Sequence, residues 1–173
     1  MRMSNMLGAL VGLLGLCAVT SVQAGQSAPK ASRAAVTGAT HVMVMPGDLK
    51  WGPVPPVLPA GGQVAVLDGD PFKPGFFTMR LKMPNGYKVA PHWHPTDENI
   101  VVVQGVFKIG SGDTFSDSAA HELPAGSFTK LPRRMHHYAG AKGETIVQIY
   151  GTGPFVVNYL NPSDDPSKKT GTK

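Results

Sequence analysis

The chain has 173 residues, with 16 lysines and arginines against 11 aspartates and glutamates, and a formal net charge of +5. This length suits one domain and is short for two. The basic residues are scattered, and aromatic residues do not alternate with them along a stripe, so the composition argues against a nucleic-acid partner.

Residues 1–24 have the pattern of a secretory signal. Arg2 supplies a positive charge, an apolar run of Gly, Leu, Val and Ala follows from about Met6 to Val19, and the segment ends on Val22-Gln23-Ala24. The run is short for a bilayer-spanning helix. We therefore expect cleavage after Ala24 and a periplasmic or secreted protein without a stable membrane span. An uncleaved N-terminal anchor is the alternative.

Cys17 is the single cysteine and lies inside the apolar run. A lipidated cysteine normally follows a small residue, whereas Leu16 precedes Cys17. We therefore expect Cys17 to be removed with the signal and not to be lipidated. After cleavage the chain would contain no cysteine, so no disulfide can form within it.

Between the signal and the tail, the chain divides by composition. Residues 25–40 are rich in Ala, Ser, Gln and Lys and predict a flexible linker, and residues 163–173 predict a disordered tail. Within 41–162, short apolar runs alternate with Gly and Pro turns, which indicates an all-β sandwich or barrel. The predicted strands are 42–45, 63–67, 76–83, 88–94, 98–109, 127–131, 135–139, 145–150 and 155–159.

The proline-rich stretch 52–59 cannot form a central strand, because proline donates no ladder hydrogen bond. It could be read as a ligand of SH3-type domains, but a loop that wraps the barrel is the interpretation we prefer for an exported protein.

The most informative motif lies between Gly86 and Gly105. His92 and His94 are two apart, so on a strand both project from one face. Pro95-Thr96 predicts a hairpin tip, after which Glu98 opens the return strand. Such a hairpin brings two imidazoles and a carboxylate together, a ligand set typical of transition metals. Asp97, as the neighbour of Glu98, should point outward and act as a turn residue.

These residues resemble the cupin family, whose first motif is G-x5-H-x-H-x3,4-E-x6-G. The second motif, G-x5-P-x-G-x2-H-x3-N, matches at Gly126, Pro132 and His137. Arg134 stands where the second motif has its other glycine, and Ala141 where it has asparagine. The resemblance covers roughly residues 40–162, and several of its stretches look like those of small secreted bacterial cupins. It implies an all-β jelly-roll barrel, the double-stranded β-helix, in a single domain.

By resemblance, the metal ligands would be His92, His94, Glu98 and His137. His136 and His137 are adjacent and face opposite ways on a strand, and the motif spacing selects His137. The cofactor would be a divalent transition metal, namely Fe, Mn, Ni, Zn or Cu. The ligand types alone do not distinguish among these metals. Some cupins keep the histidines without a known activity, and some have lost the metal.

The resemblance implies three possible functions. The first, which we prefer, is a metal-dependent oxidoreductase of dioxygenase or oxidase type, or a lyase, acting on a small organic molecule. The second is a non-enzymatic module that binds a metal or small ligand, as in the sensor half of some anti-sigma factors. The third is a metal-free sugar-binding or epimerase-like cupin, against which the export signal argues. Cupins often pair through edge strands, so a homodimer is possible.

Gln148 is a candidate for an inward polar group that hydrogen-bonds a ligand or substrate. Its orientation is ambiguous, because Ile146 and Tyr150 share its face while Val147 and Ile149 form an equally apolar one.

Overall fold

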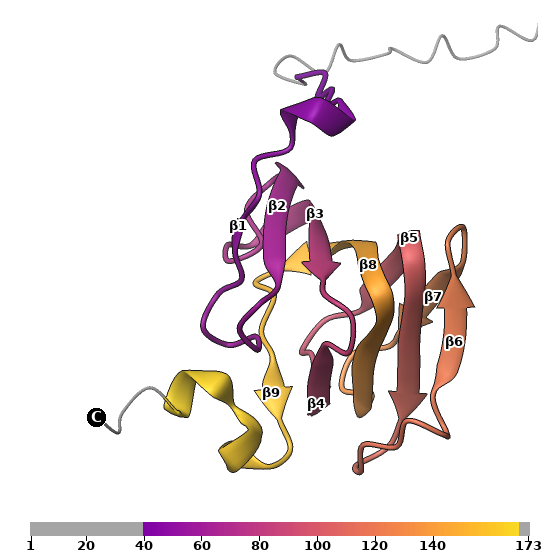
Figure 1. The fold of residues 1–173 in the computed structure, drawn as a ribbon. Coiled ribbons are helices and arrows are strands. Elements are labelled where there is room, and N and C mark those ends of the chain that lie inside the picture. The colour runs from indigo at the N-terminus through magenta and orange to yellow at the C-terminus, as the bar shows by residue number, and fades with distance from the viewer. Residues whose placement is uncertain (1–39, 170–173) are drawn as a thin grey trace, which may run out of the picture. The chain divides into compact units, whose positions relative to one another are not determined.

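The computed structural model describes residues 40–169 (Figure 1). The predicted signal, Cys17, all but the last residue of the predicted linker, and residues 170–173 of the predicted tail lie outside this range. Within the described residues, no helix combines the length and the apolar character needed to cross a membrane.

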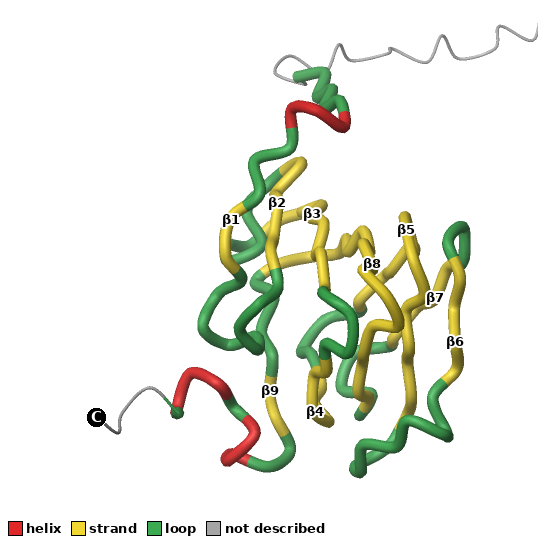
Figure 2. Tube along the Cα trace, in the orientation of Figure 1, coloured by secondary structure: helices red, strands yellow, loops and turns green. Residues whose placement is uncertain are grey.

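The described residues form one antiparallel sheet of nine strands that curls into a half-barrel, with helices only at its margins (Figures 1 and 2). This confirms the predicted all-β fold. The strands are β1 (Gly52–Pro53), β2 (Gln63–Asp68), β3 (Gly75–Met83), β4 (Lys88–Trp93), β5 (Glu98–Ser111), β6 (His121–Pro124), β7 (Phe128–Leu131), β8 (His137–Gly153) and β9 (Asn158–Tyr159).

β8 is the organising strand, because it pairs with β3, β4 and β5. The sequence predicted two strands here, at 135–139 and 145–150, whereas β8 is continuous from His137 to Gly153. The connecting residues 142–144 are exposed, and Gly143 has a φ of 74°. Opposite them, β5 shifts register between Val102 and Val106. These irregularities let the two long strands bend together without losing their pairing.

Alternating side chains from the inner faces fill the core. In β3 every second residue is buried, from Phe77 through Met79 and Leu81 to Met83. β8 contributes Val147. The remaining buried apolar residues include Leu58, Tyr87, Val89, Ile100, Val102, Phe107, Ile109, Leu131, Ala139, Ala141, Ile149 and Val157. Because successive side chains of a strand point to opposite faces, an alternating sequence places its apolar residues on the one face that packs in the core.

Residues 42–45 were predicted as a strand, and this is wrong. Val42, Met43, Val44 and Met45 are exposed and belong to no strand, and they lead into the 3-10 helix η1 (Pro46–Asp48). A strand needs a neighbour for its backbone hydrogen bonds, and among the described residues none pairs with this segment. In the same way the predicted strand 155–159 is reduced to β9.

The proline-rich stretch forms a loop, apart from the pairing of β1 with β2 at the sheet edge. Two tyrosines, the buried Tyr87 and the partly buried Tyr159, hold this loop down. The Tyr159 hydroxyl donates to the Val57 carbonyl at 2.9 Å, and the Tyr87 hydroxyl donates to the Pro59 carbonyl. The backbone of Leu58, the residue between these two carbonyls, is thereby held against the core.

The C-terminal segment of the described chain forms two more 3-10 helices, η2 (Pro162–Asp164) and η3 (Pro166–Lys168), where the sequence predicted a loose tail. Each begins with a side-chain cap, because Asn161 accepts a hydrogen bond from the Ser163 amide and Asp165 accepts one from the Ser167 amide.

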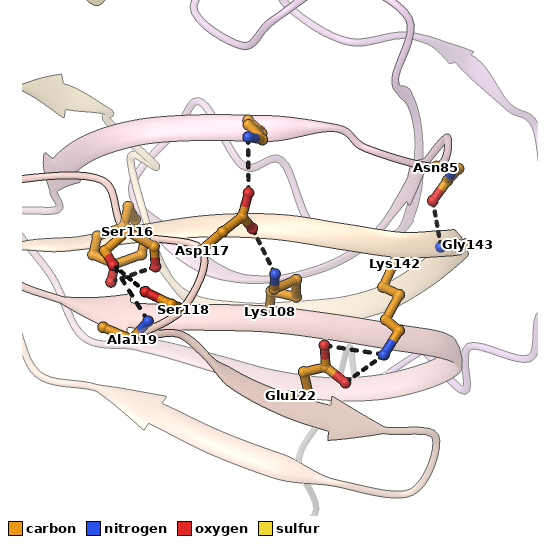
Figure 3. Close-up of polar contacts among 11 residues, drawn as sticks. Asn85, Lys108, Ser116, Asp117, Ser118, Ala119, Glu122, Lys142 and Gly143 are labelled. Atoms are coloured by element: carbon orange, nitrogen blue, oxygen red, sulfur yellow. Dashed lines mark hydrogen bonds and ion pairs between the residues drawn. The ribbon is translucent and has the colours of Figure 1, made fainter.

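The β5–β6 connection, residues 112–120, is fastened to the sheet by polar contacts (Figure 3). Asp117 forms ion pairs with Lys108 on β5 and with Lys88 on β4, the latter at 2.9 Å. The Tyr138 hydroxyl on β8 donates to the Ser116 carbonyl at 3.0 Å. β6 was not predicted, because its residues His121 to Pro124 show no strand-like apolar alternation.

Candidate metal centre

Four buried polar side chains meet inside the half-barrel. His92 lies on β4, His94 follows that strand directly, Glu98 begins β5 and His137 begins β8. Their exposed fractions are 4%, 4%, 6% and 2%. His92 and His137 face each other in the register of β4 with β8. The structure therefore brings together all four residues that the sequence predicted as ligands.

A β-bulge orients the first histidine. Val89 and His92 are both buried although they are three residues apart, because β4 shifts its register against β8 between them. Pro91 lies in this stretch and has no N–H to donate to a ladder.

Each imidazole is held by its Nδ1 atom. The Nδ1 atoms of His92, His94 and His137 lie 2.7, 2.7 and 2.9 Å from the backbone carbonyls of Ala90, Val156 and Met135. A carbonyl only accepts hydrogen bonds, so in the neutral ring Nδ1 carries the proton and Nε2 keeps its lone pair. One ligand nitrogen from each ring lies within 4.8 Å of the others.

The carboxylate of Glu98 completes the cluster. Its Oε2 atom lies 3.4 Å from Nε2 of His94 and 3.6 Å from Nε2 of His137. The Nε2 atom of His94 is fully buried and has no hydrogen-bond partner among the described residues. A buried polar atom without a partner is costly. The site thus offers three imidazole lone pairs beside one carboxylate, and the lone pair on His94 Nε2 has no hydrogen-bond partner among the described residues. This donor set fits a transition-metal cation.

Burial and mutual charge set the ionisation of the cluster. Burial lowers the pKa of His92 to about 3, and the neighbouring His137 and His94 act in the same direction. Burial also lowers the pKa of His137. For His94, burial acts to lower the pKa, but the charge and proximity of the Glu98 carboxylate, together with the Val156 carbonyl, outweigh it and the pKa is raised. Burial acts to raise the pKa of Glu98, yet the histidines hold it below its usual value. The carboxylate is thus ionised and ready to bind a cation.

The cluster lines a cavity of about 40 Å³. Apart from the three histidines and Glu98, the lining consists of Leu, Met, Val, Ile, Phe and Ala side chains. Phe155 stacks on the His94 ring, with centroids 4.5 Å apart. None of these residues, all within the described range, is a lysine, arginine, amide or hydroxyl side chain.

Gln148 does not reach this cavity, so the prediction of an inward role for it is wrong. Val147 and Ile149 are buried and line the cavity, and Gln148 between them faces the other way, where its Oε1 accepts a hydrogen bond from Nε of Arg80 at 3.3 Å. The pairing of β8 with β3 and β5 decided which of two equally apolar faces turned inward.

The neighbouring residues take supporting positions. His136 is exposed and its Nδ1 lies 2.7 Å from Asp113, as expected for the histidine that faces outward. Asp97 also points away from the cluster. It accepts a hydrogen bond from the Arg133 amide at 2.8 Å and pairs with Lys130 at 2.8 Å, so it fastens the His94–Glu98 turn to the segment that leads to His137.

Sequence motifs and backbone conformation agree at the turns. Gly86, Gly105 and Gly126 have positive φ values. Arg134, which replaces a motif glycine, is the one described non-glycine residue with positive φ, at 63°. Its amide donates to the His94 carbonyl at 2.8 Å, so the left-handed conformation is kept although the side chain disfavours it.

Comparison with solved structures supports the same fold. The polyketide cyclase RemF from Streptomyces resistomycificus is 18% identical, with a TM-score of 0.60, over 77% of this chain and 94% of that one. KdgF from Halomonas sp. is 20% identical, with a TM-score of 0.50, over 72% and 98%. An RmlC-like cupin protein from Ralstonia eutropha JMP134 is 20% identical, with a TM-score of 0.54, over 70% and 73%.

A search of curated proteins finds no significant match. The family model described as the ChrR cupin-like domain matches residues 39–156, which is more than half of the chain and includes all four residues of the cluster. The chain therefore belongs to the ChrR-like cupin family.

Proposed function

We propose that this protein is an exported cupin that binds one divalent transition metal through His92, His94, His137 and Glu98. We further propose that it acts on a small organic molecule as an oxidoreductase or a lyase. The observation that carries the proposal is the convergence of three buried imidazoles whose Nδ1 atoms are all fixed by backbone carbonyls. Fixed rings with free Nε2 lone pairs are the arrangement that metal sites require.

The chemistry available to the cavity is concentrated in these four residues. The rest of the lining offers no acid, base or nucleophile. A bound metal with open coordination positions would polarise a substrate oxygen, or exchange electrons if it is redox-active. The chain contributes the orientation of the three rings, the negative charge of Glu98, and apolar walls that exclude water and strengthen electrostatic interactions.

A non-enzymatic metal-binding module is the second candidate, and the size of the cavity favours it. A space of about 40 Å³ holds about one or two water molecules and is too small for an organic substrate unless side chains move.

Elemental analysis of protein from the exported fraction, purified without a His-tag or chelator, tests the metal site. We expect about one transition metal per chain in the wild type, and loss of the metal in His92→Ala and His137→Ala. His136→Ala is the matched control, because this adjacent histidine is exposed and should leave the metal content unchanged. A wild type that contains no metal and takes up none on reconstitution would sink the proposal.

Export is tested by separating the exported and cytoplasmic fractions and sequencing the N-terminus of the protein in each. N-terminal sequencing should give Gly25 as the first residue if the signal is cleaved after Ala24. A protein that retains Met1 in the cytoplasmic fraction would contradict it.

A further inference from the structure

A second cavity lies directly beside the metal-site cavity. It also measures about 40 Å³, and it shares Leu58, Leu81 and Phe155 with the first. The rest of its lining comes from proline, valine, phenylalanine and methionine side chains of the proline-rich loop, β2, β3 and the β2–β3 connection. The two cavities are thus separated by side chains and not by the backbone of the sheet.

Two of the three separating side chains come from loops. Leu58 belongs to the loop between β1 and β2, and Phe155 lies between β8 and β9. Phe155 contacts His94 on one side and packs edge-to-face on Phe77 at 5.8 Å on another. Because neither residue is part of a strand ladder, rotation of their side chains would open a passage beside Leu81 of β3 without breaking strand pairing.

The second cavity also extends toward solvent. Phe72 and Val66, which line it, are 60% and 48% exposed. Once the Leu58 and Phe155 side chains rotate, an apolar path would run from the surface at these residues to the histidine cluster. Large exposed apolar side chains at the end of such a path are typical of a ligand entrance.

We propose that the two cavities together form one binding site for a ligand with an aromatic or aliphatic hydrocarbon body, whose single polar group lies at the histidine cluster. A sugar, phosphate or dicarboxylate would lose its hydration in this path without gaining hydrogen bonds, so it should bind much more weakly than a hydrocarbon. A hydrocarbon body loses nothing and gains buried contact area. Coordination of the polar group rests on the proposed metal site, whereas binding of the hydrocarbon body does not.

The test uses the full-length chain after removal of metal by a chelator, with toluene as the probe and methyl NMR as the readout. Toluene should shift the methyl signals of Leu58, Leu81 and Val66, which line the second cavity, and glucose at equal concentration should not. Leu58→Trp should fill the passage and weaken toluene binding by at least about tenfold. The matched control is Val103→Trp, a partly exposed position on β5 outside both linings, which should leave binding unchanged.

Two outcomes overturn the proposal. One is the absence of shifts at these methyl groups as toluene approaches saturation in wild-type protein, a result that does not depend on any variant folding. The other is unchanged toluene binding in a Leu58→Trp protein whose spectrum shows a native fold. Because the protein is free of metal, either failure is separate from failure of the metal site, which elemental analysis measures on its own.

Discussion

At the scale of single residues, the ionisation of His92 gives the metal-free protein a distinctive response to acid. Its pKa is about 3 in the folded chain against 6.5 for an unperturbed histidine. Between these values the unfolded chain binds more protons than the folded one, so the free energy of unfolding falls as the pH drops. His92→Phe removes the group and should flatten this fall. Urea denaturation of chelator-treated protein at several pH values measures it, and equal slopes in both proteins would contradict the assignment.

Arg134 offers a second test at this scale. A left-handed backbone costs a non-glycine residue about 1–2 kcal/mol, so Arg134→Gly relieves strain in the folded chain. The glycine also gives the unfolded chain more entropy, which opposes this gain. The two effects should nearly cancel, and stability should change by less than about 1 kcal/mol. Arg134→Val should destabilise the protein by about 1–3 kcal/mol, because a branched side chain fits this φ poorly. Chemical denaturation distinguishes the two substitutions. Similar stabilities for Gly and Val would show that the backbone relaxes at this position.

At the scale of elements, the pairing of β5 with β8 depends on Gly105. A Cβ atom there would lie 2.3 Å from the Glu144 carbonyl oxygen and 2.9 Å from Cα of Thr145, and φ is +75°. Gly105→Ala should therefore cost about 2–4 kcal/mol, from strain and steric overlap together. Gly143→Ala is the control, since its φ is +74° but its Cβ would meet nothing within 4 Å. Denaturation should show a clearly smaller loss for Gly143→Ala, and equal losses would rule out the steric contribution.

The proline-rich loop should depend on its two tyrosine contacts. Burial raises the pKa of Tyr87 to about 12, so at neutral pH its hydroxyl keeps the proton that it donates to Pro59. Tyr87→Phe and Tyr159→Phe each remove one such bond, worth about 1 kcal/mol. Amide hydrogen exchange in residues 54–62 should become faster in both variants, with the sheet amides unchanged. Unaltered exchange in the loop would mean that packing of Leu58 alone holds it.

At the scale of the whole molecule, a metal that binds only the folded chain should raise its stability. The gain is about 4 kcal/mol when the free metal exceeds its dissociation constant a thousandfold. Thermal unfolding of wild-type protein with and without added Zn²⁺ should show an upward shift. His137→Ala should lose it, and His136→Ala should retain it. A shift of equal size in His137→Ala would place the bound metal elsewhere.

Pairing into a homodimer stays a prediction, to be measured by analytical ultracentrifugation.

The sequence alone determined the fold class and the membership of the histidine cluster. Three of its members, His92, His94 and Glu98, belong to one hairpin, where strand alternation and a short turn place side chains by local geometry. His137 was assigned by motif spacing, and the adjacent His136 was excluded because neighbours on a strand face opposite ways. The hairpin inference succeeded because it depends on few residues and on backbone rules that hold before any tertiary contact forms, whereas the choice of His137 depended on the resemblance to the cupin motif.

Only the tertiary structure decided the features that depend on distant partners. The inward face of β8 was set by its register against β3 and β5, which left Gln148 outside the cavity. Residues 42–45 have strand-like composition, but no strand within residues 40–169 pairs with them. Leu58 and Phe155, far apart in the sequence, meet at the wall between the two cavities because the sheet curls and both loops close over it. Such contacts follow from chain topology, which local residue patterns do not predict.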